Sequence, residues 1–266
     1  MRRRTAIGSG GREHLPKVRQ GGLRTIAVLA GLALATGSMA EGQATDPGTF
    51  SPPLGCTGWL TLQSRGCMVE NHYRCKADPP GDQWRVDFDQ VGIDYVGRID
   101  SETQWIESYS SLFPTVREAL LPNPPDAVSF STLLSSGLDT WEFGLKVDDG
   151  PQSVSSGYDR LTAKSVTIDG ITLEETEFSY SKIASDGTVL EKSTGQQYIN
   201  RDWRLFFFGV EKQDFGDSPV STDRTPVQFI FPGEKGFFST RPVFGCDLTT
   251  SSLQDPQTKG APNAES

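Results

Sequence analysis

Residues 141–151 read Trp-Glu-Phe-Gly-Leu-Lys-Val-Asp-Asp-Gly-Pro, and this stretch decides the fold class. Large apolar side chains recur at every second position from Trp141 to Val147, which is the period of a β-strand with one buried face. The Asp-Asp-Gly-Pro that follows is typical of a turn. A strand that ends in a tight turn predicts an antiparallel partner next along the chain.

More strands are predicted on the C-terminal side of this stretch, with turns between them. Asp169-Gly170 and Asp186-Gly187 are turn dipeptides, and the second predicts a two-residue hairpin loop with Ser185 opposite Thr188. The expected strands span residues 161–168, 172–183, 188–200, 203–210, 227–231 and 236–240.

The N-terminal side also begins with strands, and two short helices are predicted after them. Trp84, Val86 and Phe88 alternate with charged residues, and residues 93–97 form a further short strand candidate. We expect residues 115–121, which follow a proline, to form one or two helical turns. Asp126 is then expected to cap a second short helix, which stops at Gly137.

Together these patterns predict a mainly β domain, an antiparallel meander with one small helical insertion near residues 115–136. The connections are too short to hold the crossover helices that a parallel sheet requires. A sandwich, a barrel and a curved half-barrel all satisfy this pattern, and the sequence does not choose among them.

The start of the chain is typical of an export signal. An apolar run over residues 25–37 follows a basic leader and precedes Ser38-Met39-Ala40, a small-x-small cleavage pattern. The run is shorter than the roughly 20 residues that span a bilayer, and we expect no transmembrane segment after it. We therefore expect a periplasmic or secreted protein with a signal peptide over 1–40, a flexible linker over 41–55, a single β-rich domain over 56–247 and a disordered tail over 248–266.

The charge balance disfavours polyanionic partners. The leader carries 7 of the 25 basic and 1 of the 34 acidic residues, so 18 basic and 33 acidic residues remain, a formal charge of −15. Nucleic acid and anionic membrane surfaces would repel such a chain, and we expect neither as a partner.

The four cysteines all lie after the expected cleavage point, and their even number favours two disulfides in an oxidising compartment. A two-residue turn at Arg65-Gly66 would place Ser64 opposite Cys67 and Cys56 opposite Cys75. This register predicts the bridges Cys56–Cys75 and Cys67–Cys246, and the alternative pairs Cys67 with Cys75 and Cys56 with Cys246. The spacings do not fit a zinc site, and we expect no metal and no cofactor.

The aromatic segment that begins at Trp203 is the best candidate for a ligand surface. Consecutive apolar residues on a strand point to both faces, so this strand is either buried on both sides or borders an apolar cavity. The first reading is the commoner one, and the helix at 126–136 would then cover one face. The candidate ligand-binding residues are Trp203, Phe206, Phe208, Trp141 and Phe143, with Trp105, Phe178, Tyr180 and Tyr198 as further contributors.

Catalytic signals are weak by comparison. The predicted hairpin register places His72 on the outer face, where we expect an exposed histidine, and the chain has no Gly-x-Ser-x-Gly elbow. The acidic pairs Asp87/Asp89 and Glu175/Glu177 have a spacing that any strand provides. We therefore expect a non-catalytic binding or interaction protein, for an apolar small molecule or an envelope protein. A hydrolase that uses paired carboxylates or His72 is the alternative.

Overall fold

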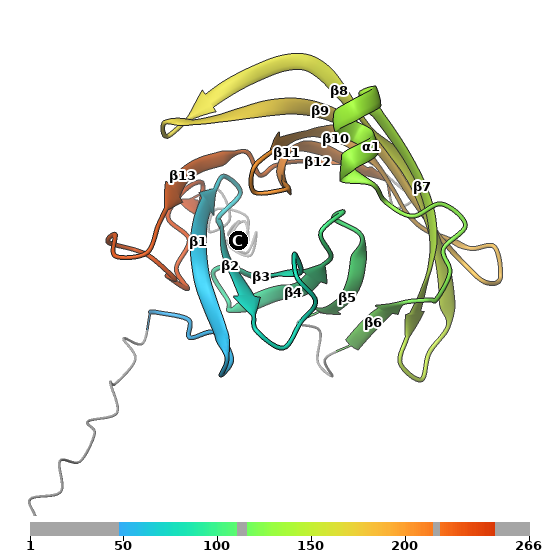
Figure 1. Cartoon of the computed structure of the whole chain (residues 1–266), viewed down its shortest axis with the longest axis horizontal. Helices are drawn as coiled ribbons and strands as arrows, with labels where there is room; N and C mark the ends of the chain where they lie inside the picture. Colours follow the sequence, from blue (N-terminus) through green and yellow to red (C-terminus); the bar gives the residue numbers. More distant parts are fainter. Residues whose placement is uncertain (1–47, 111–115, 215–218, 248–266) are drawn as a thin grey trace, which may run out of the picture. The chain divides into compact units, whose positions relative to one another are not determined.

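The computed structural model describes residues 48–110, 116–214 and 219–247. The expected signal peptide and the expected C-terminal tail lie outside these residues. The described chain is mainly β, as predicted: thirteen strands form a single antiparallel sheet with one short helix (Figure 1). The strands are β1 Cys56–Ser64, β2 Met68–Cys75, β3 Gln83–Phe88, β4 Ile93–Ile99, β5 Trp105–Ser110, β6 Val116–Leu120, β7 Leu138–Val147, β8 Gln152–Ile168, β9 Ile171–Ala184, β10 Val189–Asn200, β11 Leu205–Asp214, β12 Val220–Asp223 and β13 Pro226–Ile230, and the helix is α1 Phe130–Ser136.

The sheet is a meander that curls until its two edges are neighbours. Strands β1 to β12 pair in chain order, and β13 pairs with β1 at the opposite edge from β12. Arg224 and Thr225 alone join β12 to β13. The Arg224 N–H donates to Gly209 O of β11 at 2.9 Å, and Thr225 O accepts from the Arg65 N–H in the β1–β2 turn at 3.0 Å. These two residues therefore bridge the edges, although no strand ladder closes the described part of the sheet.

The β8–β9 hairpin reaches across the gap between the edges. It turns at Asp169 and Gly170, as predicted, with φ angles of 48° and 79°. The Phe229 N–H of β13 donates to Asp169 Oδ2 at 2.9 Å, so the tip of the hairpin contacts the far edge strand. A register irregularity between Leu161 and Ser165 bends β8 on the way to this contact.

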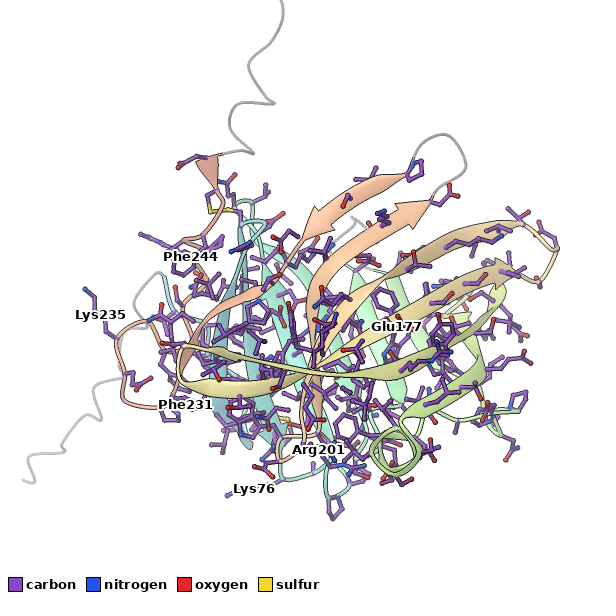
Figure 2. The ribbon with its side chains drawn as sticks, turned by 90° about the horizontal axis from the view of Figure 1, so that it is seen from above. Lys76, Glu177, Arg201, Phe231, Lys235 and Phe244 are labelled. Carbon is purple, nitrogen blue, oxygen red and sulfur yellow. A yellow bond between two sulfur atoms is a disulfide. The ribbon has the colours of Figure 1, made fainter. Side chains whose placement is uncertain are left out.

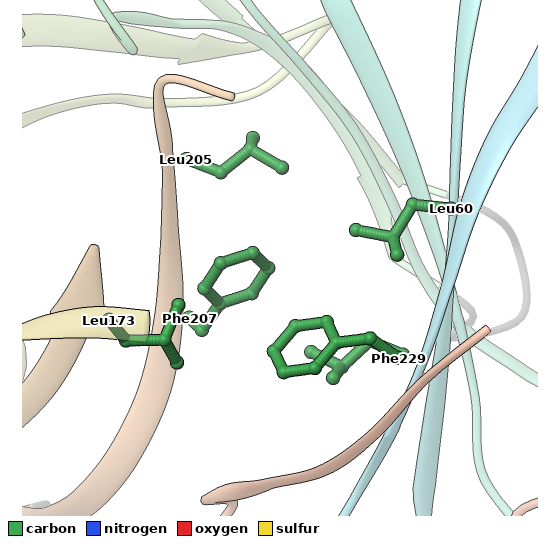
Figure 3. Packing of buried hydrophobic residues seen from close by; sticks show 6 residues of the cluster. Leu60, Leu173, Leu205, Phe207 and Phe229 are labelled. Atoms are coloured by element: carbon green, nitrogen blue, oxygen red, sulfur yellow. The ribbon is translucent and has the colours of Figure 1, made fainter. Parts of the chain in front are cut away.

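An apolar cluster, here called the apolar junction, fills the space where the edges meet (Figure 3). Its side chains come from strands that are far apart in the sequence and point toward one another. Each is nearly or completely buried, which contributes roughly 1.5–3 kcal/mol per side chain. The apolar junction consists of Leu60 and Leu62 of β1, Leu173 of β9, Leu205 and Phe207 of β11 and Phe229 of β13.

A second cluster covers the outer face of β2 and β3. Val69, Tyr73 and Val86 pack there beneath Phe50 and Phe238. The Phe50 N–H donates to Phe238 O at 2.7 Å, and Thr49 bridges to Ser239. The end of the expected 41–55 linker is therefore part of the folded domain.

The predicted register of the first hairpin is wrong by one residue. Ser64 pairs with Met68 rather than with Cys67, so the turn has three residues, and a bulge at Trp59 restores the pairing of Cys56 with Cys75. Between turn and bulge, Leu60 lies opposite His72. His72 therefore faces the inside of the sheet and is only 2 % exposed, which corrects the expectation of an outward, exposed histidine.

The β9–β10 hairpin also has a turn one residue longer than predicted. Val189 pairs with Ile183 and the Ala184 N–H donates to Thr188 O, so Ser185 belongs to a three-residue loop. The predicted helical turns over 115–121 are also wrong, because residues 116–120 form β6, in which Leu120 pairs with Leu145 of β7.

The remaining differences are small. Helix α1 is capped by Ser129, whose side chain accepts from the Thr132 N–H, and Asp126 instead forms an isolated bridge with Glu142. Gly137 ends the helix in a left-handed conformation, as predicted. Residues 236–240, expected as a strand, form turns around a single bridge at Ser239.

Both predicted disulfides are confirmed. Cys56–Cys75 joins the two strands of the first hairpin, and Cys67–Cys246 ties the β1–β2 turn to the end of the domain. Two disulfides indicate that the chain folds in an oxidising environment.

We expect the two bridges to contribute unequally to stability. Their cysteines are 19 and 179 residues apart, and a longer loop removes more entropy from the unfolded chain. Replacing Cys67 and Cys246 by serine should cost about 5 kcal/mol, against about 3 kcal/mol for Cys56 and Cys75. Urea unfolding of the two double variants measures both losses, and equal losses would contradict the loop-length account.

Candidate functional site

The curled sheet encloses a cavity of about 400 Å³. This volume lies within the range of small-molecule sites, which is about 300–1,000 Å³. The lining side chains come from nearly every strand between β2 and β11, because alternate residues of each strand point inward. Trp105 and Asp94 both border the cavity, and both are exposed to solvent, Trp105 to 41 %. The cavity therefore reaches the surface near β4 and β5.

Four aromatic side chains form one side of the cavity, here called the aromatic wall. It consists of Trp105 of β5, Trp141 and Phe143 of β7, and Tyr180 of β9. Neighbouring ring centroids are 5.5–6.3 Å apart, the spacing of tilted and edge-on aromatic pairs.

Gly157 of β8 makes room for this wall. It pairs with both Trp141 and Tyr180, and a Cβ there would lie 2.8 Å from the Trp141 indole. The indole therefore lies over the glycine, beside the Tyr180 ring.

Arg85 and Asp87 also line the cavity, and with Glu70 they form a buried ion-pair group. Arg85 Nε lies 2.9 Å from Asp87 Oδ1, and Arg85 NH1 lies 3.7 Å from Glu70 Oε2. The Arg85 guanidinium also lies over the rings of Tyr95 and Phe208, at 5.1 Å from each centroid. This arrangement places two carboxylates on one cation inside the protein.

The two carboxyl groups respond to this competition in opposite directions. Burial would raise the pKa of both, but the Arg85 charge and the neighbouring His72 hold the pKa of Glu70 below its ordinary value. Burial and the Glu70 charge raise the pKa of Asp87, in spite of Arg85. Asp87 is therefore the member of the pair that holds a proton more readily.

His72 lies beside this group with both ring nitrogens lacking a hydrogen bond. Its Nε2 is 3.7 Å from Glu70 Oε2, and burial lowers its pKa, so the ring is neutral at neutral pH. His72 borders the cavity. Because Nε2 is turned toward Glu70, Nδ1 is the ring nitrogen that remains for a ligand.

A second acidic group lies beside Tyr180. Glu191 of β10 accepts from Gln213 Nε2 at 3.3 Å, and burial together with the charge of Glu211 raises the pKa of Glu191. Glu118 of β6 is paired with Lys182 Nζ at 2.7 Å.

Asp159 of β8 connects the aromatic wall to the acidic lining. Its Oδ2 accepts from the Trp141 indole N–H at 3.0 Å, and the residue is 8 % exposed. Burial raises the pKa of Asp159 to about 7.

The structure brings together four of the five residues chosen from the sequence. Trp141, Phe143, Phe206 and Phe208 border the cavity. Trp203 does not border it, because it lies in the turn before β11 and packs against the apolar junction, 5.8 Å from Phe229.

The two faces of β11 are covered unequally: Leu205 and Phe207 are buried, Phe206 and Phe208 are half-buried, and Val210 is exposed. The prediction that both faces of this strand are buried therefore holds for one face only. Phe207 faces the apolar junction, whereas Phe206 packs edge-on against Phe130 of α1 at 5.5 Å while bordering the cavity. Tyr198, the outlying candidate, packs against the apolar junction.

Sequence reasoning missed the charged lining. Arg85 and Asp87 alternate with Trp84, Val86 and Phe88, and such a pattern normally marks a solvent face. Here both faces of β3 are covered, and the charged one lines the cavity.

The residues suggested for hydrolysis have other partners. Glu175 contacts Lys164 and Glu177 contacts Arg160, while Asp89 accepts from two backbone N–H groups in the β3–β4 turn. In the described part of the chain, no hydroxyl donates to His72 and no three metal-ligating side chains gather as a site.

Comparisons with protein-family models, with curated proteins and with solved structures found no match to this chain. The described residues contain no helix with the length and apolar character needed to cross a membrane.

The buried Asp159 carboxyl predicts a specific pH dependence. Its pKa is about 7 when folded and about 3.9 when unfolded, so its contribution to stability is complete below pH 4 and falls as pH rises toward 7. Asp159→Asn removes this titration. We expect the difference in unfolding free energy, variant minus wild type, to be about 3 kcal/mol larger at pH 8 than at pH 5.

Urea unfolding at the two pH values measures this change. Asp149→Asn, in the exposed β7–β8 turn, is the matched control and should follow the wild-type pH dependence. An Asp159→Asn variant that also follows the wild-type dependence would show that the carboxyl is ionised in the folded protein at pH 5.

Proposed function

We propose that this protein is an exported, non-catalytic binding protein that holds a small molecule with an apolar body inside its curled sheet. The observation that carries the proposal is the cavity of about 400 Å³ with an aromatic wall on one side. The aromatic wall faces water in this cavity, and a ligand with an apolar body would remove that apolar surface from water.

The polar lining supports a binding role as well. Small-molecule sites combine an apolar surface with a few polar groups that orient the ligand. Here His72 and Asp159 are such groups, and they lie on different strands around the same cavity.

Export is supported by two independent features. The apolar run over residues 25–37 with its cleavage pattern is typical of a secretory signal, and both disulfides suit the periplasm or the extracellular space. The ligand would therefore be a molecule of the cell envelope or the surroundings.

The proposal is tested with the neutral apolar dye N-phenyl-1-naphthylamine, whose fluorescence rises in apolar sites. We expect saturable binding with one site per chain. Ser108 borders the cavity, so Ser108→Phe should fill part of the space. The affinity should fall by roughly tenfold or more, because a misfit of about 1.4 kcal/mol already has that effect.

Ser165→Phe is the matched control, since Ser165 is exposed on the β8–β9 hairpin. It should bind the dye as wild type does. Wild-type protein that does not bind the dye, or equal binding by both variants, would refute a site in the cavity. Native mass spectrometry of protein from its own host checks independently for a retained molecule.

A further inference from the structure

The charges around the cavity are unequal. Among the described residues, carboxylates at its border outnumber arginines, and the arginines are Arg85 and Arg224. The carboxylates are Asp87, Asp94, Asp159, Glu118, Glu191 and Glu211.

The available cations are already engaged with part of this set. Arg85 contacts Asp87 and the nearby Glu70, and Lys182 contacts Glu118. The charge of Arg224 acts to lower the pKa of Glu70, Asp87 and Glu191, although the net pKa of the last two is raised. Arg224 is therefore surrounded by acidic side chains.

Asp94 is exposed, and Asp159, Glu191 and Glu211 are the remaining acids of the set with no lysine or arginine at ion-pair distance among the described residues. Asp159 accepts from a neutral indole N–H and Glu191 from a neutral amide. Burial and the charge of Glu211 raise the pKa of Glu191, so ionisation of Glu191 is opposed. A cation that entered the cavity would relieve this repulsion and offset the cost of burying the carboxylates.

The aromatic wall favours the same kind of ligand. Trp and Tyr rings attract cations through their faces, and the attraction grows when the cation is desolvated. The Asp159 carboxyl accepts from the Trp141 indole N–H, so it lies at the edge of that ring. Tyr180 is close enough to Glu191 and Glu118 for their charges to raise its pKa further, after burial.

His72 adds an independent observation. It is 2 % exposed, it borders the cavity, and neither ring nitrogen has a hydrogen-bond partner. A neutral imidazole offers an acceptor nitrogen, which suits an N–H donor on a ligand.

We propose that the ligand is an organic cation, with an ammonium or similar positively charged nitrogen group on an apolar body. The apolar body lies against the aromatic wall, and the charged group faces Glu191 of β10 and Glu211 of β11. This inference rests on the proposed function, because it requires the cavity to be a ligand site. An anionic amphiphile would bring its charge beside Glu191 and Glu211, which disfavours it.

Three probes with ten carbon atoms each test the sign of the ligand's charge: decylammonium, 1-decanol and decanoate. Titration calorimetry of the full mature protein with each probe measures the affinities. We expect decylammonium to bind about tenfold or more tightly than decanol, because one pKa unit of charge interaction is a tenfold effect. Decanoate should bind most weakly.

The double variant Glu191→Gln/Glu211→Gln should narrow the preference for decylammonium over decanol by about tenfold. Glu177→Gln is the matched control, because Glu177 also lies in the sheet (Figure 2) but pairs with Arg160 and does not line the cavity. It should leave the preference unchanged.

The outcomes separate this inference from the proposed function. Equal binding of all three probes, or a preference for decanoate, overturns the cation inference and leaves a ligand-binding cavity. Failure of all three to bind removes the proposed function as well. The wild-type comparison suffices for both conclusions if the double variant does not fold.

Discussion

The apolar junction is the contact on which the rest of the structure depends. It joins side chains from β1, β9, β11 and β13, which a meander by itself would leave at opposite ends of a long sheet. Sequential hairpins provide local pairing, but they do not decide how far a sheet curls. Burial of these six side chains holds the edges together, and the curl in turn creates an inside. Without that inside, the inward residues of β2 to β10 would line an open surface and no cavity would exist.

This architecture buries charged side chains at the cavity, and their desolvation lowers the stability of the folded protein. Glu70, Arg85 and Asp87 lie inside a small protein, where a buried ion pair commonly contributes little net stability. The same strands carry Val69, Val86 and Phe88 on their other face, beneath Phe50 and Phe238. The outer face of β2 and β3 is thus the apolar one, and their inner face is polar. This inversion is what one expects of strands whose inner face meets a ligand or water rather than a packed core.

The sequence predicts the fold class and the central strands because both rest on local patterns, such as the alternation in β7 and the turn dipeptide Asp169-Gly170. The pairing of Cys56 with Cys75 is right, although the predicted turn is wrong, because the bulge at Trp59 offsets the extra turn residue, and Cys67–Cys246 follows by elimination. The sequence misplaces what depends on a single residue of register. A three-residue turn and a bulge at Trp59 move His72 from the outside to the inside, and no local pattern distinguishes the two cases. Four cavity residues were found from their aromatic character, but Trp203 and the charged lining depend on the curl, which is a tertiary property.

The long bridge also bears on how the chain reaches its oxidised form. Cys56, Cys67 and Cys75 emerge from the ribosome close together, and Cys246 follows 171 residues after Cys75. At ordinary elongation rates of about 5–20 residues per second, that interval is on the order of 10–30 s. During this interval the thiols of Cys56, Cys67 and Cys75 can form three different pairs, of which only Cys56–Cys75 is native. Cys67 has no native partner until Cys246 is synthesised. Rapid oxidation in this window would trap mispaired hairpins, and the native pairing then requires thiol–disulfide exchange once the last cysteine arrives.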